Sequence, residues 1–553
     1  MFNLSKIVSD PQILVTGLLI AVMNQAMYRR LGIKLALLVK NREFFFLLVV
    51  TLLLVPVYLK NSTFFTISPD SQGLLRSPAG NTTYRPPLLW GTYRLFASQK
   101  EIDKFFESRP ISGEKLTYPE LLQGSNFIMM CYLASLVFLL WVLYKYLKID
   151  ARLLVMVALI QTSGPLYYMT DYFYIPTFLV PVYKLLFYFL ISQMFLSEVS
   201  KLLPKINRKK IDFFNSLVVL CLGSLFLLIS SRSSLMVDEI NQIMTETLTM
   251  TLINLTLALC AILFTVKNKL LLRYIVGALG LTTGLLVIIK LSTILTPLII
   301  LLFLLLLKHP IKEKIVASML LLTLAISPCI FTTITGTNSK TSQTWYGLVA
   351  YAIEFQSERP LDLKVSKDSQ ELLDSALRKR AETWKKYPEI VSEYDFTFQK
   401  TPISLFYGVL PAAQELGFDN VSPSYTSELF KEISISSFNA HKDLAVRALL
   451  ENLKVPIGLF KLDGQYMSMS KIFKNPLVYF LFLGIFLRYF PRRTQAESLL
   501  ILLLFSFIFV NYVAVSIFNG PIPRYFYLYD PLLLYSVIVM FSKCLDQLRE
   551  RIT

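Results

Sequence analysis

Long apolar runs alternate with short polar connections along most of the chain. A helix that crosses about 30 Å of hydrocarbon needs roughly 20 apolar residues, and many runs reach or approach this length. We assign spans to 13–30, 44–59, 126–144, 152–169, 173–195, 213–230, 248–266, 273–289, 291–307, 314–334, 475–490, 497–518 and 527–542. The pattern predicts an all-α polytopic membrane protein of about 12 or 13 transmembrane helices. The number depends on 13–30, which Asn24 and Gln25 interrupt, so that an interfacial helix or an uncleaved signal anchor is the alternative.

Two longer polar segments, 60–125 and 335–474, divide the apolar pattern. They predict an N-terminal transmembrane bundle (1–334) that includes the loop 60–125, a mainly helical domain (335–474), and C-terminal transmembrane helices with a tail (475–553). Within 335–474, Asp368-Ser-Gln-Glu371 resembles a capping box at a helix start. A second amphipathic helix is predicted from about Asn439 to Lys454. Its expected apolar face comprises Ala445, Val446, Leu449, Leu450 and Leu453.

Lysine and arginine recur in every second connection between the runs, for example at Lys267–Arg273 and Lys308–Lys314. Cytoplasmic loops carry such an excess of basic residues. The alternation predicts a cytoplasmic C-terminus, and it places the segments 60–125 and 335–474 on the extracytoplasmic side.

Composition agrees with a membrane protein, since 54% of the 553 residues are hydrophobic and only 17% are charged. The net charge of +18 comes mainly from the predicted cytoplasmic loops, because segment 335–474 carries 17 basic and 17 acidic residues. A nucleic-acid-binding surface is therefore not expected. With two histidines, and five cysteines inside or beside apolar runs, a multi-histidine metal site and a Ser-His-Asp triad are largely excluded, and disulfides are not expected.

Asp70 lies in the first predicted outer loop, in Ser68-Pro-Asp-Ser71, about eleven residues after the second run. A carboxylate beside a low-dielectric wall can act as a general base or hold a divalent cation. The alternative is a turn in which the aspartate caps a short helix, because Asp and Ser favour such positions.

Three cations at the predicted outer surface are candidates for binding an anion: Arg85, Lys290 and Arg524. Arg85 precedes two prolines, which stiffen its backbone. Lys290 interrupts apolar sequence and is best placed at a turn between two spans, because a lysine at mid-bilayer depth costs roughly 2.5–3.5 kcal/mol. Arg524 follows a proline and adjoins a tyrosine cluster. The alternative for Arg85 and Lys290 is a basic side chain that extends to lipid headgroups.

Other acids on the predicted outer side are Asp171, Asp238 and Glu239, for which solvated loop positions are the simplest interpretation. Short Asn-X-Ser/Thr sequences, including one at Asn254 inside an apolar run, are read as chance matches.

The order of these features resembles the GT-C superfamily of polytopic membrane glycosyltransferases. It is most similar to bacterial protein O-mannosyltransferase and aminoarabinose transferase-like proteins. The motifs that carry the resemblance are Ser68-Pro-Asp-Ser71, Tyr84-Arg-Pro-Pro87, Lys290-Leu-Ser-Thr293 and Arg524-Tyr525. The likeness covers the spans and the first outer loop, whereas 335–474 matches no motif of the family.

The resemblance implies an enzyme that moves a sugar from a polyprenyl-phosphate donor to a hydroxyl of a lipid, glycan or protein acceptor, with inversion. Asp70 would be the general base, and Arg85, Lys290 and Arg524 would hold the donor phosphate. Many family members have an acidic pair in the first loop, whereas Ser71 follows Asp70 here. The resemblance thus leaves open a requirement for Mg²⁺ or Mn²⁺, with Asp171, Asp238 or Glu239 as a substitute second acid.

An integral protein of a bacterial inner membrane, with its active site on the extracytoplasmic side, is the expected setting. Two other classes use similar ligands: a transporter or flippase of lipid-linked glycans, and a polymerase or ligase of surface polysaccharide. Ion-coupled transport would call for charged residues deep inside the spans, and the spans have almost none.

Overall fold

The computed structural model describes residues 42–67, 75, 87–108, 110, 115–151, 153–155, 157–158, 246–290, 293–334, 340–388, 401–418, 423–454, 495–518, 532, 535–536, 538–539 and 542. These residues are mostly helical and contain no strand, which confirms the all-α prediction for this part of the chain. Three described helices are long and apolar enough to cross a membrane, namely Pro119–Leu147, Lys269–Ile289 and Ile311–Phe331. Spans predicted at 13–30, 173–195, 213–230 and 475–490 lie outside the described residues.

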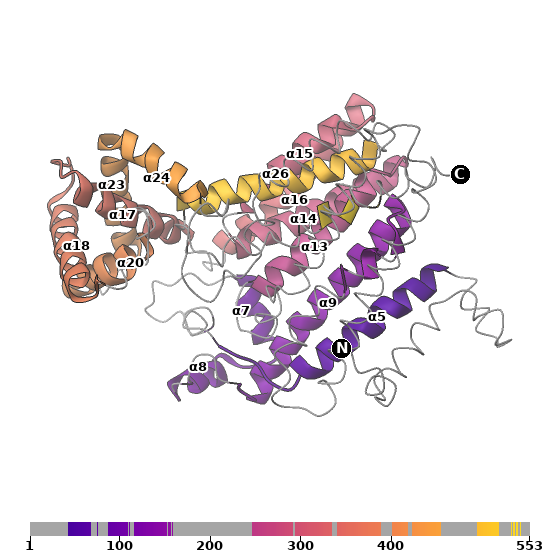
Figure 1. Ribbon diagram of the computed structural model, residues 1–553, viewed down its shortest axis with the longest axis horizontal. Helices are drawn as coiled ribbons and strands as arrows, with labels where there is room; N and C mark the ends of the chain where they lie inside the picture. The colour runs from indigo at the N-terminus through magenta and orange to yellow at the C-terminus, as the bar shows by residue number, and fades with distance from the viewer. Residues whose placement is uncertain are drawn as a thin grey trace, which may run out of the picture.

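A bundle of apolar helices forms the larger part of the described structure (Figure 1). It comprises α5 (Arg42–Asn61), α9 (Pro119–Leu147), α13 (Glu246–Leu263), α14 (Lys269–Ile289), α15 (Thr296–Leu306), α16 (Ile311–Ile334) and α26 (Gln495–Phe518). α5 and α9 are antiparallel, since Glu43 at the start of α5 pairs with Lys145 near the end of α9 at 3.1 Å. At the other end, the Asn126 side chain donates to the carbonyl of Ser62 at 3.0 Å.

The run predicted as a span at 291–307 forms a shorter helix than expected. α15 begins only at Thr296, because Lys290 ends α14 and Pro297 favours the first turn of a new helix. Its eleven residues extend about 17 Å at 1.5 Å per residue, which is less than the hydrocarbon thickness.

α14 and α16 run parallel and approach closely through glycine. Arg273 in α14 pairs with Glu313 at the start of α16 at 3.1 Å, and Gly284 later in α14 lies against Ala325 and Pro328 later in α16. A side chain at Gly284 would meet the Ala325 backbone, so the absence of a Cβ atom permits this contact. Lys290 therefore lies at the end of the bundle opposite to the basic residues that begin α14.

Pro328 lies inside α16 and cannot donate a backbone hydrogen bond to Leu324. The hydroxyl of Ser327 donates to the Leu324 carbonyl instead, at 3.0 Å. This carbonyl therefore has a partner, and α16 continues past the proline to Ile334.

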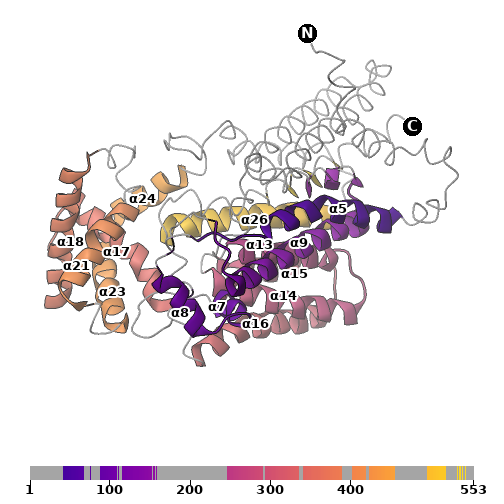
Figure 2. The ribbon, with the colours of Figure 1, turned by 90° about the horizontal axis from the view of Figure 1, so that it is seen from below.

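A second group of helices, the α17–α24 unit, has its own apolar cluster that includes Ile353, Leu372 and Phe430. It comprises α17 (Lys340–Glu358), α18 (Lys367–Lys386), α20 (Thr401–Ser404), the π-helix η5 (Leu405–Val409), α21 (Leu410–Glu415), α23 (Pro423–Ala440) and α24 (Lys442–Lys454). The unit and the small helices α7 and α8 lie at the same end of the bundle (Figures 1 and 2).

The predicted capping box at Asp368 is wrong, because Ser366 is the N-cap of α18. The Ser366 hydroxyl accepts from the Ser369 amide and donates to Glu432 in α23. Hydrogen bonds from Ser366 and Ser369 hold the pKa of Glu432 below its usual range, so this carboxylate ties α18 to α23. Asp368 instead accepts a hydrogen bond from the hydroxyl of Tyr425.

The helix predicted from Asn439 to Lys454 is interrupted at His441, where α23 ends and α24 begins. The predicted apolar face of α24 is only partly covered by the rest of the protein. Leu444 and Ala448 are buried, whereas Val446 and Leu450 are 58% and 55% exposed. Val446 and Leu450 thus form an exposed apolar stripe on α24, and Ala445 and Leu449 lie half-buried beside it.

Candidate functional site

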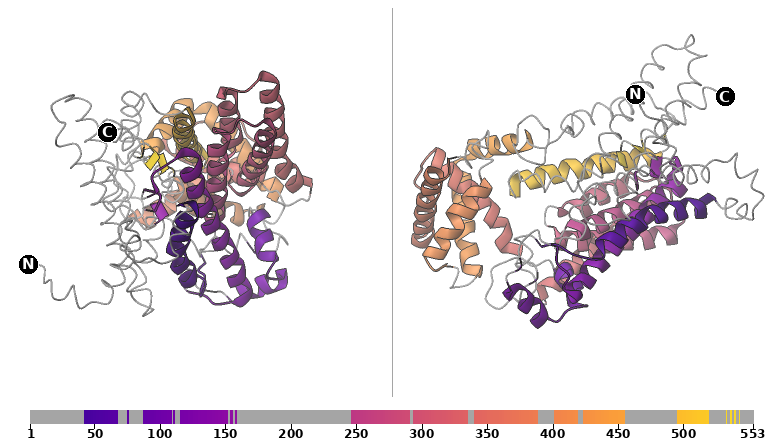
Figure 3. Two further views of the ribbon diagram at one scale, coloured as in Figure 1. Left: turned by 90° about the vertical axis from the view of Figure 1, so that its right-hand side faces the viewer. Right: turned by 60° about the horizontal axis from the view of Figure 1, so that its bottom comes forward.

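The described parts of the first predicted outer loop, 60–67, 75, 87–108, 110 and 115–125, form a packed cap over one end of the bundle. Phe65 and Leu116 form an isolated antiparallel bridge, with backbone N–O distances of 2.9 and 2.8 Å between them. α8 (Gln99–Glu107) starts in a complete capping box formed by Ser98 and Glu101, and it buries Phe105 against Phe65. We call this end of the bundle, where α5 ends, α9 begins and α7 and α8 lie, the cap end (Figure 3).

Both flanks of the segment that contains Asp70 are fixed at the cap end. Ile67, three residues before Asp70, is buried, and Leu75, five residues after it, is fully buried. The Gln99 amide donates to the Leu75 carbonyl at 3.0 Å, and its oxygen accepts from the indole of Trp90 at 2.8 Å. Asp70 itself lies outside the described residues.

α7 (Pro87–Arg94) begins two residues after Arg85 and lies between two helices of the bundle. Tyr93 packs against Gly124 in the second turn of α9, and α7 also contacts α14. These contacts fix the start of α7, which is only two residues from Arg85 in the chain. Arg85 lies outside the described residues.

Lys290 is the site residue that the structure describes. It is the C-cap of α14, and its carbonyl accepts hydrogen bonds from the backbone and the hydroxyl of Thr293 at 3.0 and 2.7 Å. The predicted turn between two apolar segments is present. The side chain is only 8% exposed, so protein covers it and it does not extend freely from the surface.

Lys290 lies at the cap end because α14 runs parallel to α16, and the α17–α24 unit follows the end of α16. Figures 1 and 2 show that unit at the same end as α7 and α8. The scaffold thus brings Lys290 to the end that holds the flanks of Asp70 and the start of α7. The remaining candidates, Asp171, Asp238, Glu239 and Arg524, lie outside the described residues.

Within the described ranges, no cluster of three or more His, Cys, Asp or Glu residues is arranged to hold a metal ion. The predicted acids for such a site are not in those ranges. The described residues therefore do not bear on a requirement for Mg²⁺ or Mn²⁺, which the resemblance leaves open.

Two buried polar networks escaped the sequence analysis. In the bundle, the amide of Asn254 donates to Ser135 and accepts from Tyr535, both at 3.3 Å, so this asparagine is buried where α13 meets α9 and Tyr535. In the α17–α24 unit, Arg380 pairs with Glu354 through two hydrogen bonds of 2.9 and 2.8 Å. The sequence does hint at the first network, because Asn254 is a polar residue inside an apolar run. Local spacing gives no hint of the pair Arg380 and Glu354, which are far apart in the chain.

Comparisons of the chain with protein-family models, with curated proteins and with solved structures found no match.

Proposed function

We propose that the protein is a membrane glycosyltransferase that takes a sugar from a polyprenyl-phosphate donor at the cap end of its bundle. The observation that carries the proposal is the position of Lys290, a cation covered by protein at the end where both flanks of Asp70 are held. A cation with restricted access to water interacts more strongly with an anion than a fully exposed one does. The donor phosphate is an anion that remains next to the membrane, since its isoprenoid tail stays in lipid.

In the proposed reaction Asp70 accepts the proton of an acceptor hydroxyl as that oxygen attacks the anomeric carbon. The bond from this carbon to the phosphate oxygen breaks, and polyprenyl phosphate leaves. The configuration at the anomeric carbon is thereby inverted. Lys290, together with Arg85 and Arg524, stabilises the negative charge that grows on the leaving phosphate. The acceptor is a lipid, a glycan or a protein, and the cap end faces the extracytoplasmic side.

The distribution of charge in the described helices of the bundle favours this proposal over ion-coupled transport of lipid-linked glycans. Acidic and basic residues of α5, α9, α13, α14, α16 and α26 lie in the first two or last two turns, and α15 has none. Ion-coupled transporters place such residues within the membrane core. A polymerase or ligase of surface polysaccharide remains the alternative enzyme. It differs from the proposed glycosyltransferase in the lipid-linked donor that it consumes.

Lys290→Met is expected to weaken donor binding on the order of 10- to 100-fold, because one charge-assisted contact to phosphate is lost. The measurement is the dependence of sugar transfer on donor concentration in reconstituted vesicles. Lys269→Met is the matched control, since Lys269 begins the same helix, is 64% exposed and lies at the opposite end. Equal donor affinity in the two variants would remove Lys290 from the site.

A further inference from the structure

The apolar stripe of α24 borders an open pocket between α24 and its neighbours. The pocket has a volume of about 240 Å³, and its wall is formed by Tyr351 and Phe355 of α17, Phe438 of α23, and Ala445, Val446 and Leu449 of α24. No charged side chain is in this wall. Such a cavity is smaller than the roughly 300–1,000 Å³ of sites for drug-sized ligands, so it fits part of one hydrocarbon chain.

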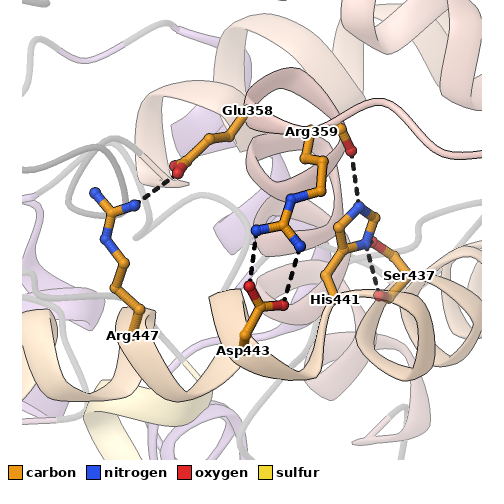
Figure 4. Close-up of polar contacts among 6 residues, drawn as sticks. All are labelled: Glu358, Arg359, Ser437, His441, Asp443 and Arg447. Carbon is orange, nitrogen blue, oxygen red and sulfur yellow. Dashed lines mark hydrogen bonds and ion pairs between the residues drawn. The ribbon is translucent and has the colours of Figure 1, made fainter.

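Ion pairs fix α24 to α17 beside this pocket (Figure 4). Arg359 donates to both carboxylate oxygens of Asp443 at 3.3 and 2.7 Å, and Arg447 pairs with Glu358 at 2.6 Å. Arg447 also donates to Glu451 at 2.8 Å. Because both arginines are engaged by carboxylates, they are poorly suited to select an anionic headgroup, and the pocket offers only apolar contact.

His441 holds the junction at which α24 begins. Its Nε2 atom lies 2.8 Å from the Arg359 carbonyl and its Nδ1 atom 2.9 Å from the Ser437 carbonyl, so one buried ring links α17 and α23 (Figure 4). The His441 contacts and the ion pairs therefore hold α17, α23 and α24, which form the wall of the pocket, in fixed positions.

Two of the helices that form the pocket also contact the bundle of apolar helices. Both α17 and α24 contact α26, an apolar helix of the bundle. Leu450 extends the apolar surface along α24 beyond the pocket wall, to which Val446 belongs. An amphipathic helix with an uncovered apolar face next to membrane helices is typical of elements that lie against lipid.

We propose that the pocket binds one acyl chain of a membrane phospholipid and so anchors the α17–α24 unit to the bilayer surface. The chain covers Val446 and Leu450, fills the space beside Phe355 and Phe438, and leaves its headgroup in water. Phospholipid acyl chains are the hydrocarbon that surrounds a membrane-spanning bundle, and the small volume suits one such chain. The proposal does not depend on the glycosyltransferase function.

The test uses the full chain in phosphatidylcholine vesicles that contain a phospholipid with a diazirine at the end of one acyl chain. After irradiation, mass spectrometry is expected to find labels on Tyr351, Phe355 or Phe438. Val446→Asp should lower this labelling about tenfold or more, because a carboxylate is strongly disfavoured next to hydrocarbon. Ala445→Phe, which fills the pocket instead of charging it, should lower it as well.

Phe406→Asp is the control, since Phe406 lies in η5, outside the pocket, and its 56% exposure matches that of Val446. Labelling of Phe127 and Met130, exposed residues of α9, reports that each variant is folded in the bilayer. Labels confined to the bundle, or pocket labelling unchanged in both pocket variants, would overturn the proposal. Labelling by a diazirine-bearing polyprenyl phosphate and not by the phospholipid would overturn the assignment to phospholipid.

Discussion

Replacing Arg380 by methionine is expected to destabilise the α17–α24 unit by roughly 3–5 kcal/mol. The side chain of Glu354 is fully buried, and Arg380, itself 12% exposed, supplies its counter-charge. The hydroxyl of Ser404 donates to the same carboxylate, so three helices, α17, α18 and α20, meet at this point. Without the guanidinium, a buried negative charge has only a hydroxyl to compensate it. Hydrogen exchange of the α17 and α18 amides in the full chain measures the effect.

Arg378→Met provides the matched control on the same helix. Arg378 is 59% exposed and pairs with Glu415 at 3.3 Å, and exposed pairs contribute only about 0–1 kcal/mol. Its exchange rates should be close to those of the wild type. The double variant Glu354→Leu/Arg380→Met should recover most of the lost stability, because removing both charges is often neutral. Equal effects of the two single arginine variants would show that the buried pair has no special role.

Gly284→Ala is expected to separate α14 from α16 and to cost about 1–3 kcal/mol, the range for overpacking in a tight interface. The added methyl group would overlap the carbonyl of Ala325 and lie 2.9 Å from Cγ of Pro328. A backbone carbonyl cannot rotate away as a flexible side chain can. Thermal denaturation of the purified protein in detergent measures the loss.

The same substitution at Gly91, Gly91→Ala, should stabilise the protein instead of destabilising it. A methyl group there meets no atom within 4 Å, and Gly91 lies inside α7. Replacing a helical glycine by alanine typically stabilises by roughly 0.5–1 kcal/mol. If Gly91→Ala lowered the melting temperature as much as Gly284→Ala, close packing of α14 on α16 would not be the cause.

Apolar runs predicted the helices of the bundle because burial and membrane insertion both select continuous apolar sequence. The run 273–289 corresponds to α14, and 314–334 corresponds to α16. α9 begins at Pro119, before the predicted 126, because its first turns carry polar residues and lie at the cap end. Periodicity also predicted the amphipathic helix α24, but the exposure of Val446 and Leu450 depends on which elements pack against this helix and not on its own sequence.

The candidate site was predicted only in part. The sequence placed Lys290 at a turn, because a lysine is costly inside a bilayer, and the structure confirms the turn. Its burial, with 8% of the residue exposed, is a tertiary property that local spacing does not reveal. For the same reason the pairing of Glu354 with Arg380 could not be predicted. The roles of Asp70, Arg85 and Arg524 stay predictions that rest on a family resemblance.

The central claim is that a sugar leaves a polyprenyl phosphate at the cap end with Asp70 as the base. The direct measurement is transfer of labelled sugar in reconstituted vesicles that contain a polyprenyl-phosphate donor and a membrane extract as the acceptor source. The wild type is expected to release one polyprenyl phosphate for each sugar transferred, and Asp70→Asn to lower the rate about 100- to 10,000-fold. Full turnover by Asp70→Asn, or movement of the intact lipid-linked sugar without bond cleavage, would contradict the claim.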